Sequence, residues 1–126
     1  MAKVLVVEDN PANMTLATFL LQSAGHSVLS ARDAETGLAL ARVEQPDLVL
    51  MDIQLAGMDG LEATALLKSD PSTRAIPVIA LTALAMKGDE QRILAAGCDG
   101  YIAKPLAYKE FLATISAQLV KAPLYG

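Results

Sequence analysis

The sequence predicts an α/β protein in which a five-stranded parallel sheet is doubly wound, with helices on both of its faces. Three observations predict this fold. Five short strand-like runs alternate along the chain with five longer segments of helical pattern. The first, third and fourth runs are apolar throughout, as in parallel strands that are buried on both sides. A chain of 126 residues is long enough to enclose one core of this kind.

The first half of the chain contains three predicted strands and two predicted helices. The strands cover residues 4–7, 27–31 and 48–51, and the helices cover about residues 11–24 and 34–43. Asn10 and Pro11 begin the first helix, because asparagine caps helix N-termini and proline suits the first turn. Gly25 ends this helix, and Asp33 caps the next one.

The second half of the chain continues the alternation with two more strands and three more helices. The strands cover residues 78–81 and 101–103, and the helices cover about residues 61–68, 87–96 and 107–121. Gly57 and Gly60 lie in the loop before the first of these helices, and Asp70 and Pro71 follow it. Gly97 ends the middle helix.

Polar side chains that could form one site follow four of the five predicted strands directly. They are Glu8 and Asp9 after the first strand, Asp52 after the third, Thr82 after the fourth and Lys104 after the fifth. Right-handed crossovers place the carboxyl ends of all parallel strands at one edge, where such sheets bind their ligands. Close carboxylates raise the pKa of one another unless a cation intervenes, and oxygen ligands suit Mg²⁺.

The same residues fit phosphoryl transfer. In this hypothesis, Asp52 acts as a nucleophile toward a phosphoryl group and becomes an acyl phosphate. Lys104 and the metal stabilise charge on the transferring group, and the Thr82 hydroxyl donates a hydrogen bond to it once it is attached. Taken singly, each residue also has an ordinary structural interpretation, such as a turn acid for Asp52 or an exposed loop lysine for Lys104.

Four segments in this order resemble the receiver domain of bacterial two-component response regulators. They are residues 6–10, 46–52, 81–83 and 101–105. Residues 85–90 and 97–98 further resemble DivK-like single-domain regulators of cell cycle and polarity. The resemblance covers almost the whole chain and implies a flavodoxin-like sheet with the strand order 2-1-3-4-5. It also implies a receiver domain at residues 1–122, followed by a short tail at 123–126.

The resemblance assigns a role to each residue at the strand ends. Asp52 corresponds to the phosphoacceptor, and Lys104 to the residue that contacts the phosphoryl group. Asp9 corresponds to a direct Mg²⁺ ligand, and Glu8 to a ligand that acts mostly through water. The remaining assignments are the backbone carbonyl of Gln54 as a further metal ligand, Thr82 and Tyr101 as the switch pair, and a cis Lys104–Pro105 bond.

The function implied by the resemblance is a phosphorylation-dependent signalling switch. The donor would be a phosphohistidine of a histidine kinase or phosphotransfer protein, docking near residues 10–14 and 105–106. The output would be protein contact through residues 87–107 and the last helix, with slow autodephosphorylation and no turnover chemistry. Met1 and the short tail favour a complete protein, and the cytosol is the expected location.

Composition excludes several other classes of protein. One cysteine and one histidine allow neither a disulfide framework nor a cysteine- or histidine-based metal site. The net charge is −4 and the ten basic residues are scattered, so direct nucleic-acid binding is not expected. No apolar stretch has the length of a membrane span or of a signal peptide.

Three positions bear on how the switch is tuned. The family often carries proline where this chain has Ala56, which predicts a less rigid loop without loss of a catalytic group. Gln54 and Leu84 lie two residues after Asp52 and Thr82, where the family tunes hydrolysis of the acyl phosphate. An apolar Leu84 hinders an attacking water, so we hypothesise a phosphorylated state of moderate to long lifetime.

Other functions remain open at the level of sequence. The chain can be read as a receiver excised from a hybrid histidine kinase, or as a receiver-like scaffold that is not phosphorylated. A phosphate-hydrolysing enzyme with an aspartyl nucleophile would need a second acid near it, and position 54 is Gln. A flavin-binding protein would need a phosphate-binding loop after the first strand, and Glu8 and Asp9 would repel a phosphate there.

Overall fold

The computed structural model describes residues 2–83 and 87–121 and contains one five-stranded parallel sheet. The strand order is β2-β1-β3-β4-β5, and all four neighbouring pairs are parallel. This confirms the fold class predicted from the alternation of strands and helices, and the strand order implied by the resemblance. Leu84 and the expected tail at 123–126 lie outside the described residues.

Strands and helices alternate strictly along the chain. The strands are β1 (Lys3–Val7), β2 (Ser27–Ala31), β3 (Leu48–Asp52), β4 (Val78–Thr82) and β5 (Gly100–Ala103). The helices are α1 (Pro11–Ser23), α2 (Ala34–Glu44), α3 (Gly60–Ser69), α4 (Lys87–Ala95) and α5 (Tyr108–Lys121). All bounds lie within one or two residues of those predicted from the sequence.

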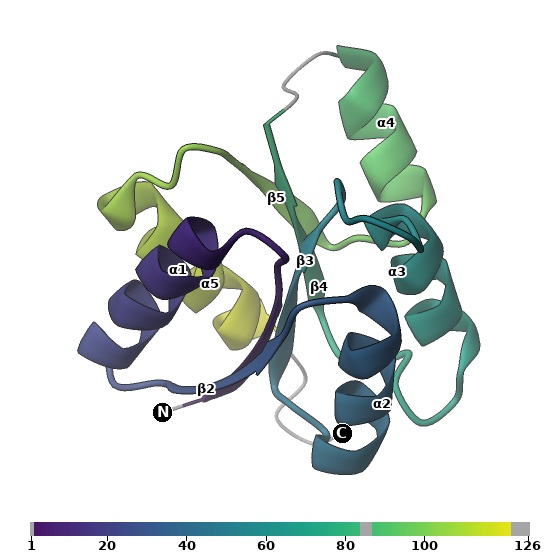
Figure 1. The fold of residues 1–126 in the computed structure, drawn as a ribbon, viewed down its shortest axis with the longest axis horizontal. Helices are drawn as coiled ribbons and strands as arrows, with labels where there is room; N and C mark the ends of the chain where they lie inside the picture. Colours follow the sequence, from purple (N-terminus) through teal and green to yellow (C-terminus); the bar gives the residue numbers. More distant parts are fainter. Residues whose placement is uncertain (1, 84–86, 122–126) are drawn as a thin grey trace.

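The helices form two layers around the sheet. Helices α1 and α5 cover one face, and α2, α3 and α4 cover the other (Figure 1). Each face has its own apolar cluster: Leu21 and Phe111 belong to the first, and Leu38 and Leu67 to the second. Strands β3 and β4 are buried at every position because both of their faces are covered, which explains their continuous apolar sequence.

Side chains cap the helices that start near the carboxyl edge of the sheet. The Asn10 side chain accepts hydrogen bonds from the backbone N–H groups of Ala12 and Asn13, as expected for a cap. Helix α3 begins at Gly60, one residue earlier than predicted, and Asp59 is its cap. The sequence pattern does not indicate that cap, because glycine next to it is typical of a loop and not of a helix.

The register of the central strands determines which residues meet at the carboxyl edge. Val7 of β1 pairs with Met51 of β3, so the next residues, Glu8 and Asp52, emerge side by side. The Lys104–Pro105 bond is cis, as the resemblance implied. None of the helices within residues 2–83 and 87–121 combines the length and hydropathy needed to cross a bilayer.

Candidate functional site

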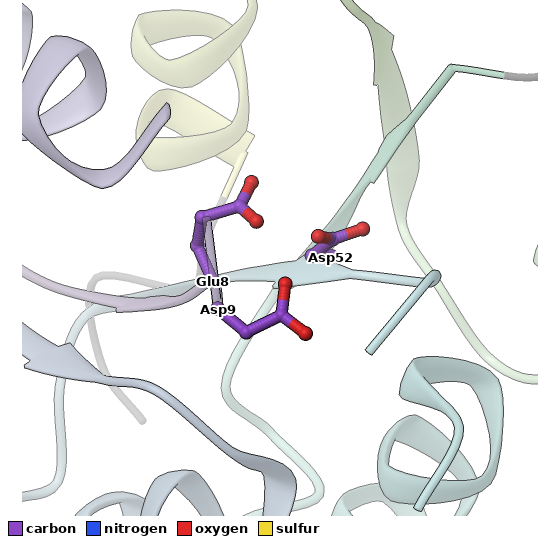
Figure 2. Close-up of side chains that lie close together, drawn as sticks. All are labelled: Glu8, Asp9 and Asp52. Carbon is purple, nitrogen blue, oxygen red and sulfur yellow. The ribbon is translucent and has the colours of Figure 1, made fainter. Parts of the chain in front are cut away.

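Three carboxylates converge at the carboxyl edge of the sheet. Glu8, Asp9 and Asp52 each offer a carboxylate oxygen, and these oxygens lie within 4.8 Å of one another. Figure 2 shows Glu8 and Asp9 leaving the end of β1 and Asp52 leaving the end of β3, with their carboxyl groups directed toward a shared space. We call these three residues the acidic cluster. Asp9 is exposed, whereas Glu8 and Asp52 are only 1% and 2% exposed.

Lys104 brings a positive charge to the acidic cluster from the end of β5. Its Nζ lies 2.9 Å from Glu8 Oε1 and 3.0 Å from Asp52 Oδ2. The backbone positions this side chain, because the N–H of Lys104 donates to the carbonyl of Thr82 at 2.7 Å and so extends the pairing of β4 with β5. One ammonium therefore contacts two of three carboxylates, and the cluster keeps an excess of negative charge.

The pKa shifts of these groups reflect burial and mutual contact. Burial, followed by the hydrogen bond shared with Asp52, raises the pKa of Glu8 above its ordinary value. Burial also raises the pKa of Asp52, but hydrogen bonds from Glu8, the Gln54 N–H and Lys104 outweigh it and leave that pKa lowered. Burial disfavours the Lys104 ammonium, yet its contacts with Glu8 and Asp52 outweigh this and raise its pKa. Asp52 is therefore the more strongly ionised of the two buried acids.

Backbone N–H groups orient each carboxylate of the acidic cluster. Asp52 Oδ1 accepts from the N–H of Gln54 at 2.9 Å, and Glu8 Oε2 accepts from that of Asn10 at 3.2 Å. Asp9 Oδ2 accepts from the N–H of Ala56 at 3.2 Å, across a sequence separation of 47 residues. Sequence reasoning did not identify this last contact, because no local pattern encodes a hydrogen bond between two distant loops.

A glycine allows the loop after β3 to fold back over the strand. A Cβ added at Gly60 would overlap the backbone carbonyl of Asp52, so only glycine allows α3 to start this close to the strand end. The close approach keeps the segment between Asp52 and α3 short. This segment carries Gln54 and Ala56, whose N–H groups face the acidic cluster.

The donor set of the acidic cluster fits a hard divalent cation. Glu8 Oε1 is buried and contacts the Lys104 ammonium, but it accepts no hydrogen bond of good geometry from the described part of the chain. A buried carboxylate oxygen in this state retains capacity for a further cation or water. All candidate ligands are oxygens, which Mg²⁺ prefers in proteins. The residues present therefore satisfy the requirements of a magnesium site.

The remaining predicted site residues surround this cluster. Thr82 is fully buried at the end of β4, next to the strand that carries Asp52. Tyr101 lies on the edge strand β5 and is 38% exposed. The Gln54 side chain is exposed, so its backbone is the part that faces Asp52. The structure thus brings together Glu8, Asp9, Asp52 and Lys104, and it holds Tyr101 at the periphery.

This fold, with an acidic cluster and a lysine at the carboxyl edge, defines a class of phosphoryl-accepting signalling proteins. The chain belongs to the response regulator receiver domain family, whose model matches residues 4–116. It is 49% identical over 116 residues to the polar-differentiation response regulator DivK of Brucella anthropi, covering 92% of this chain and 94% of that protein. The DivK protein of Brucella ovis matches at the same identity and coverage.

Solved structures agree with this assignment. The receiver domain of a sensor histidine kinase from Pseudomonas aeruginosa superposes with a TM-score of 0.87 at 35% identity, covering 94% of this chain and 97% of that one. That domain was crystallised with a magnesium ion coordinated in its active-site cleft. A response regulator from Chloroflexus aurantiacus superposes with a TM-score of 0.91 at 26% identity, covering 94% and 98% of the two chains.

Family membership excludes two of the functions that the sequence left open. The chain is a phosphoacceptor signalling switch of two-component systems and not a turnover enzyme, so the phosphate-hydrolysing and flavin-binding alternatives are discarded. A receiver domain implies a histidine kinase as partner.

Proposed function

We propose that Asp52 is the residue that accepts the phosphoryl group. Asp52 is the last residue of the central strand β3, and it is nearly buried. The main support for this assignment is the contact between Asp52 Oδ2 and Lys104 Nζ, which lie 3.0 Å apart beside the acidic cluster. This contact keeps the carboxylate ionised and places an ammonium where negative charge on a transferring group would develop.

The transfer forms one bond and breaks another. An oxygen of the Asp52 carboxylate attacks the phosphorus of a phosphohistidine, a P–O bond forms and the P–N bond breaks. The imidazole leaves with the electron pair of that bond and takes up a proton, and Asp52 becomes an acyl phosphate. Lys104 neutralises charge on the phosphoryl oxygens, and the Thr82 hydroxyl donates a hydrogen bond to one of them after transfer.

Mg²⁺ is the proposed cofactor of this site. Glu8, Asp9, Asp52 and the backbone carbonyl of Gln54 would hold it, Glu8 mostly through water. The cation supplies charge neutralisation, which lets a phosphoryl group enter a negatively charged site. Two observations support this assignment. Glu8 Oε1 is buried and accepts no hydrogen bond of good geometry from the described residues, and all the candidate ligand atoms are oxygens.

The proposal is tested with a small acyl-phosphate donor and intact mass spectrometry. With Mg²⁺ present, the wild-type protein gains one phosphoryl group, and without Mg²⁺ it gains far less. The Asp52→Asn variant gains none, whereas Asp89→Asn, on helix α4, is the matched control and gains the group like the wild type. Phosphorylation of Asp52→Asn to the wild-type level would contradict the assignment.

The proposed donor docks on helix α1, next to the acidic cluster. A shallow, open apolar groove runs along this helix and is lined by Pro11, Ala12, Thr15, Leu16 and Phe19. Phe19 is 66% exposed, which is unusual for a phenylalanine on the surface of a small domain. The groove begins two residues after Asp9, so a helix seated in it can present a phosphohistidine to Asp52.

The proposed output uses the opposite end of the site. In this proposal, Thr82 moves toward the phosphoryl group, Tyr101 follows inward, and the surface formed by α4, β5 and α5 changes for a downstream protein. The outward position of Tyr101 supports this role, because an exposed ring has room to move inward. An acyl phosphate of moderate to long lifetime and a cytoplasmic location, where histidine kinases carry out phosphotransfer, complete the proposal.

A further inference from the structure

A hydrogen bond joins the two loops that border the acidic cluster. The backbone N–H of Ala56, in the loop between β3 and α3, donates to Asp9 Oδ2 in the loop after β1 at 3.2 Å. Both residues are exposed, so this contact is not imposed by packing of the core. The donor of this hydrogen bond is Ala56, at the position where the family often carries proline.

The bond leaves Asp9 able to serve as a ligand. Oδ2 is the oxygen that accepts from Ala56, and Asp9 still offers a carboxylate oxygen within 4.8 Å of those from Glu8 and Asp52. Figure 2 shows the Asp9 carboxyl group directed toward the side of Asp52. The hydrogen bond and the ligand arrangement therefore exist together in one conformation and do not exclude one another.

We propose that the Ala56 N–H is a positioning group for Asp9, which holds this exposed carboxylate in place for a divalent cation before the cation arrives. The inference rests on the proposed magnesium site. An exposed aspartate is otherwise free to change rotamer, and ordering it on binding costs conformational entropy. A carboxylate already held by an N–H avoids part of that cost, and a proline at position 56 cannot supply the donor.

The test compares two substitutions at position 56 by Mg²⁺ titration calorimetry. Ala56→Pro removes the N–H and weakens Mg²⁺ binding by about two- to tenfold, as expected for one lost hydrogen bond. Ala56→Ser keeps the N–H and binds within about twofold of the wild type. Proline also stiffens the loop, and stiffening alone would leave binding unchanged or tighter. Equal or tighter binding by Ala56→Pro would therefore overturn the proposal.

A second measurement does not depend on Mg²⁺ or on the proline variant. In the metal-free protein, Asp9→Ala removes the acceptor, so the Ala56 amide proton shifts upfield and exchanges with solvent about two- to tenfold faster. The amide of Gln54, which donates to Asp52, is the internal reference and keeps its exchange rate. An Ala56 amide that does not respond to Asp9→Ala would overturn the proposal.

The outcomes separate this inference from the proposed function. Mg²⁺ binding that is insensitive to Ala56→Pro would remove the positioning role and leave the site intact. Absence of Mg²⁺ uptake by the wild type at millimolar levels would overturn the magnesium site and this inference together. The assignment of Asp52 would still be decided separately by the mass of Asp52→Asn.

Discussion

Two lysine–carboxylate clusters lie at the two ends of the parallel strands, one at the amino edge of the sheet and one at the carboxyl edge. They differ in how completely their charges and hydrogen-bonding groups are paired. At the amino edge, Lys68 Nζ contacts Asp99 Oδ2 at 3.0 Å and donates to the carbonyls of Ile76 and Arg74 at 2.8 and 3.3 Å. Asp99 Oδ2 also accepts from the N–H of Val78 at 2.8 Å. One positive charge meets one negative charge, and all three protons of the ammonium have acceptors.

The carboxyl edge uses the same residue types without reaching that balance. Lys104 contacts two buried carboxylates, and a third carboxylate lies beside them. Among the residues described, Glu8 Oε1 contacts the Lys104 ammonium but accepts no hydrogen bond of good geometry. The amino-edge pair ties α3 to the starts of β4 and β5 and is complete in itself. The acidic cluster keeps an excess of negative charge that a further cation could neutralise, and the amino-edge pair does not.

Replacing the two lysines by methionine gives the largest expected contrast. Lys104→Met removes the ammonium that faces the phosphoryl oxygens, so the rate of phosphorylation by an acyl-phosphate donor falls by roughly a hundredfold. Mg²⁺ affinity does not fall, because the cation no longer competes with the ammonium for Glu8 and Asp52. Lys68→Met is the matched control and keeps the rate within about twofold. Equal rates for the two variants would remove the distinction between the clusters.

The same two variants also differ in how Mg²⁺ affects their stability, and this effect is smaller than the effect on the phosphorylation rate. Lys68→Met loses an ion pair and two hydrogen bonds at a partly exposed site, so the free energy of unfolding falls by about 1–2 kcal/mol. Lys104→Met also destabilises the metal-free protein, because it leaves two buried carboxylates without their cation. Saturating Mg²⁺ restores the stability of Lys104→Met and not that of Lys68→Met. Urea denaturation with and without Mg²⁺ measures both effects, and rescue of Lys68→Met would contradict this interpretation.

The pH dependence of stability gives the smallest expected effect. Burial raises the pKa of Glu8 in the folded protein above the ordinary 4.5, so the folded state binds more protons than the unfolded state in this range. The free energy of unfolding of the metal-free protein therefore decreases as the pH rises from about 4.5 through the folded pKa of Glu8. The lowered pKa values of Asp52, Asp33 and Asp70 act in the opposite sense and at lower pH.

Glu8→Gln is the variant that isolates this effect. It removes the decrease, and its stability becomes nearly independent of pH over the same window. Denaturation series at several pH values, in the absence of divalent cations, measure the slope. A slope in Glu8→Gln equal to that of the wild type would assign the dependence to another group.

Much of this arrangement could be predicted from the sequence, because local patterns encode it. Continuous apolar runs identified the buried strands, and caps such as Asn10 and Asp33 marked where helices begin. The rule that parallel strands end at one edge then predicts that Glu8, Asp52 and Lys104 lie together.

Contacts between segments that are distant in the sequence could not be predicted in this way. The pairing of Lys68, in α3, with Asp99 and the pairing of Ala56 with Asp9 depend on how the fold brings these segments together, and residue type alone does not select them. The early start of α3 at Gly60 has the same cause, since it depends on the close approach of that residue to the backbone of Asp52.

Asp52 ends a strand that is buried along its whole length and paired on both sides. The proposed acceptor carboxylate is consequently attached to a backbone that is held by neighbouring strands on both sides, and we expect that it cannot swing out to meet a donor. In the proposed transfer, the incoming protein has to deliver its phosphohistidine along the line of attack that this strand defines. Discrimination among donors then depends on surface fit around the site, while the acceptor stays the same for all of them.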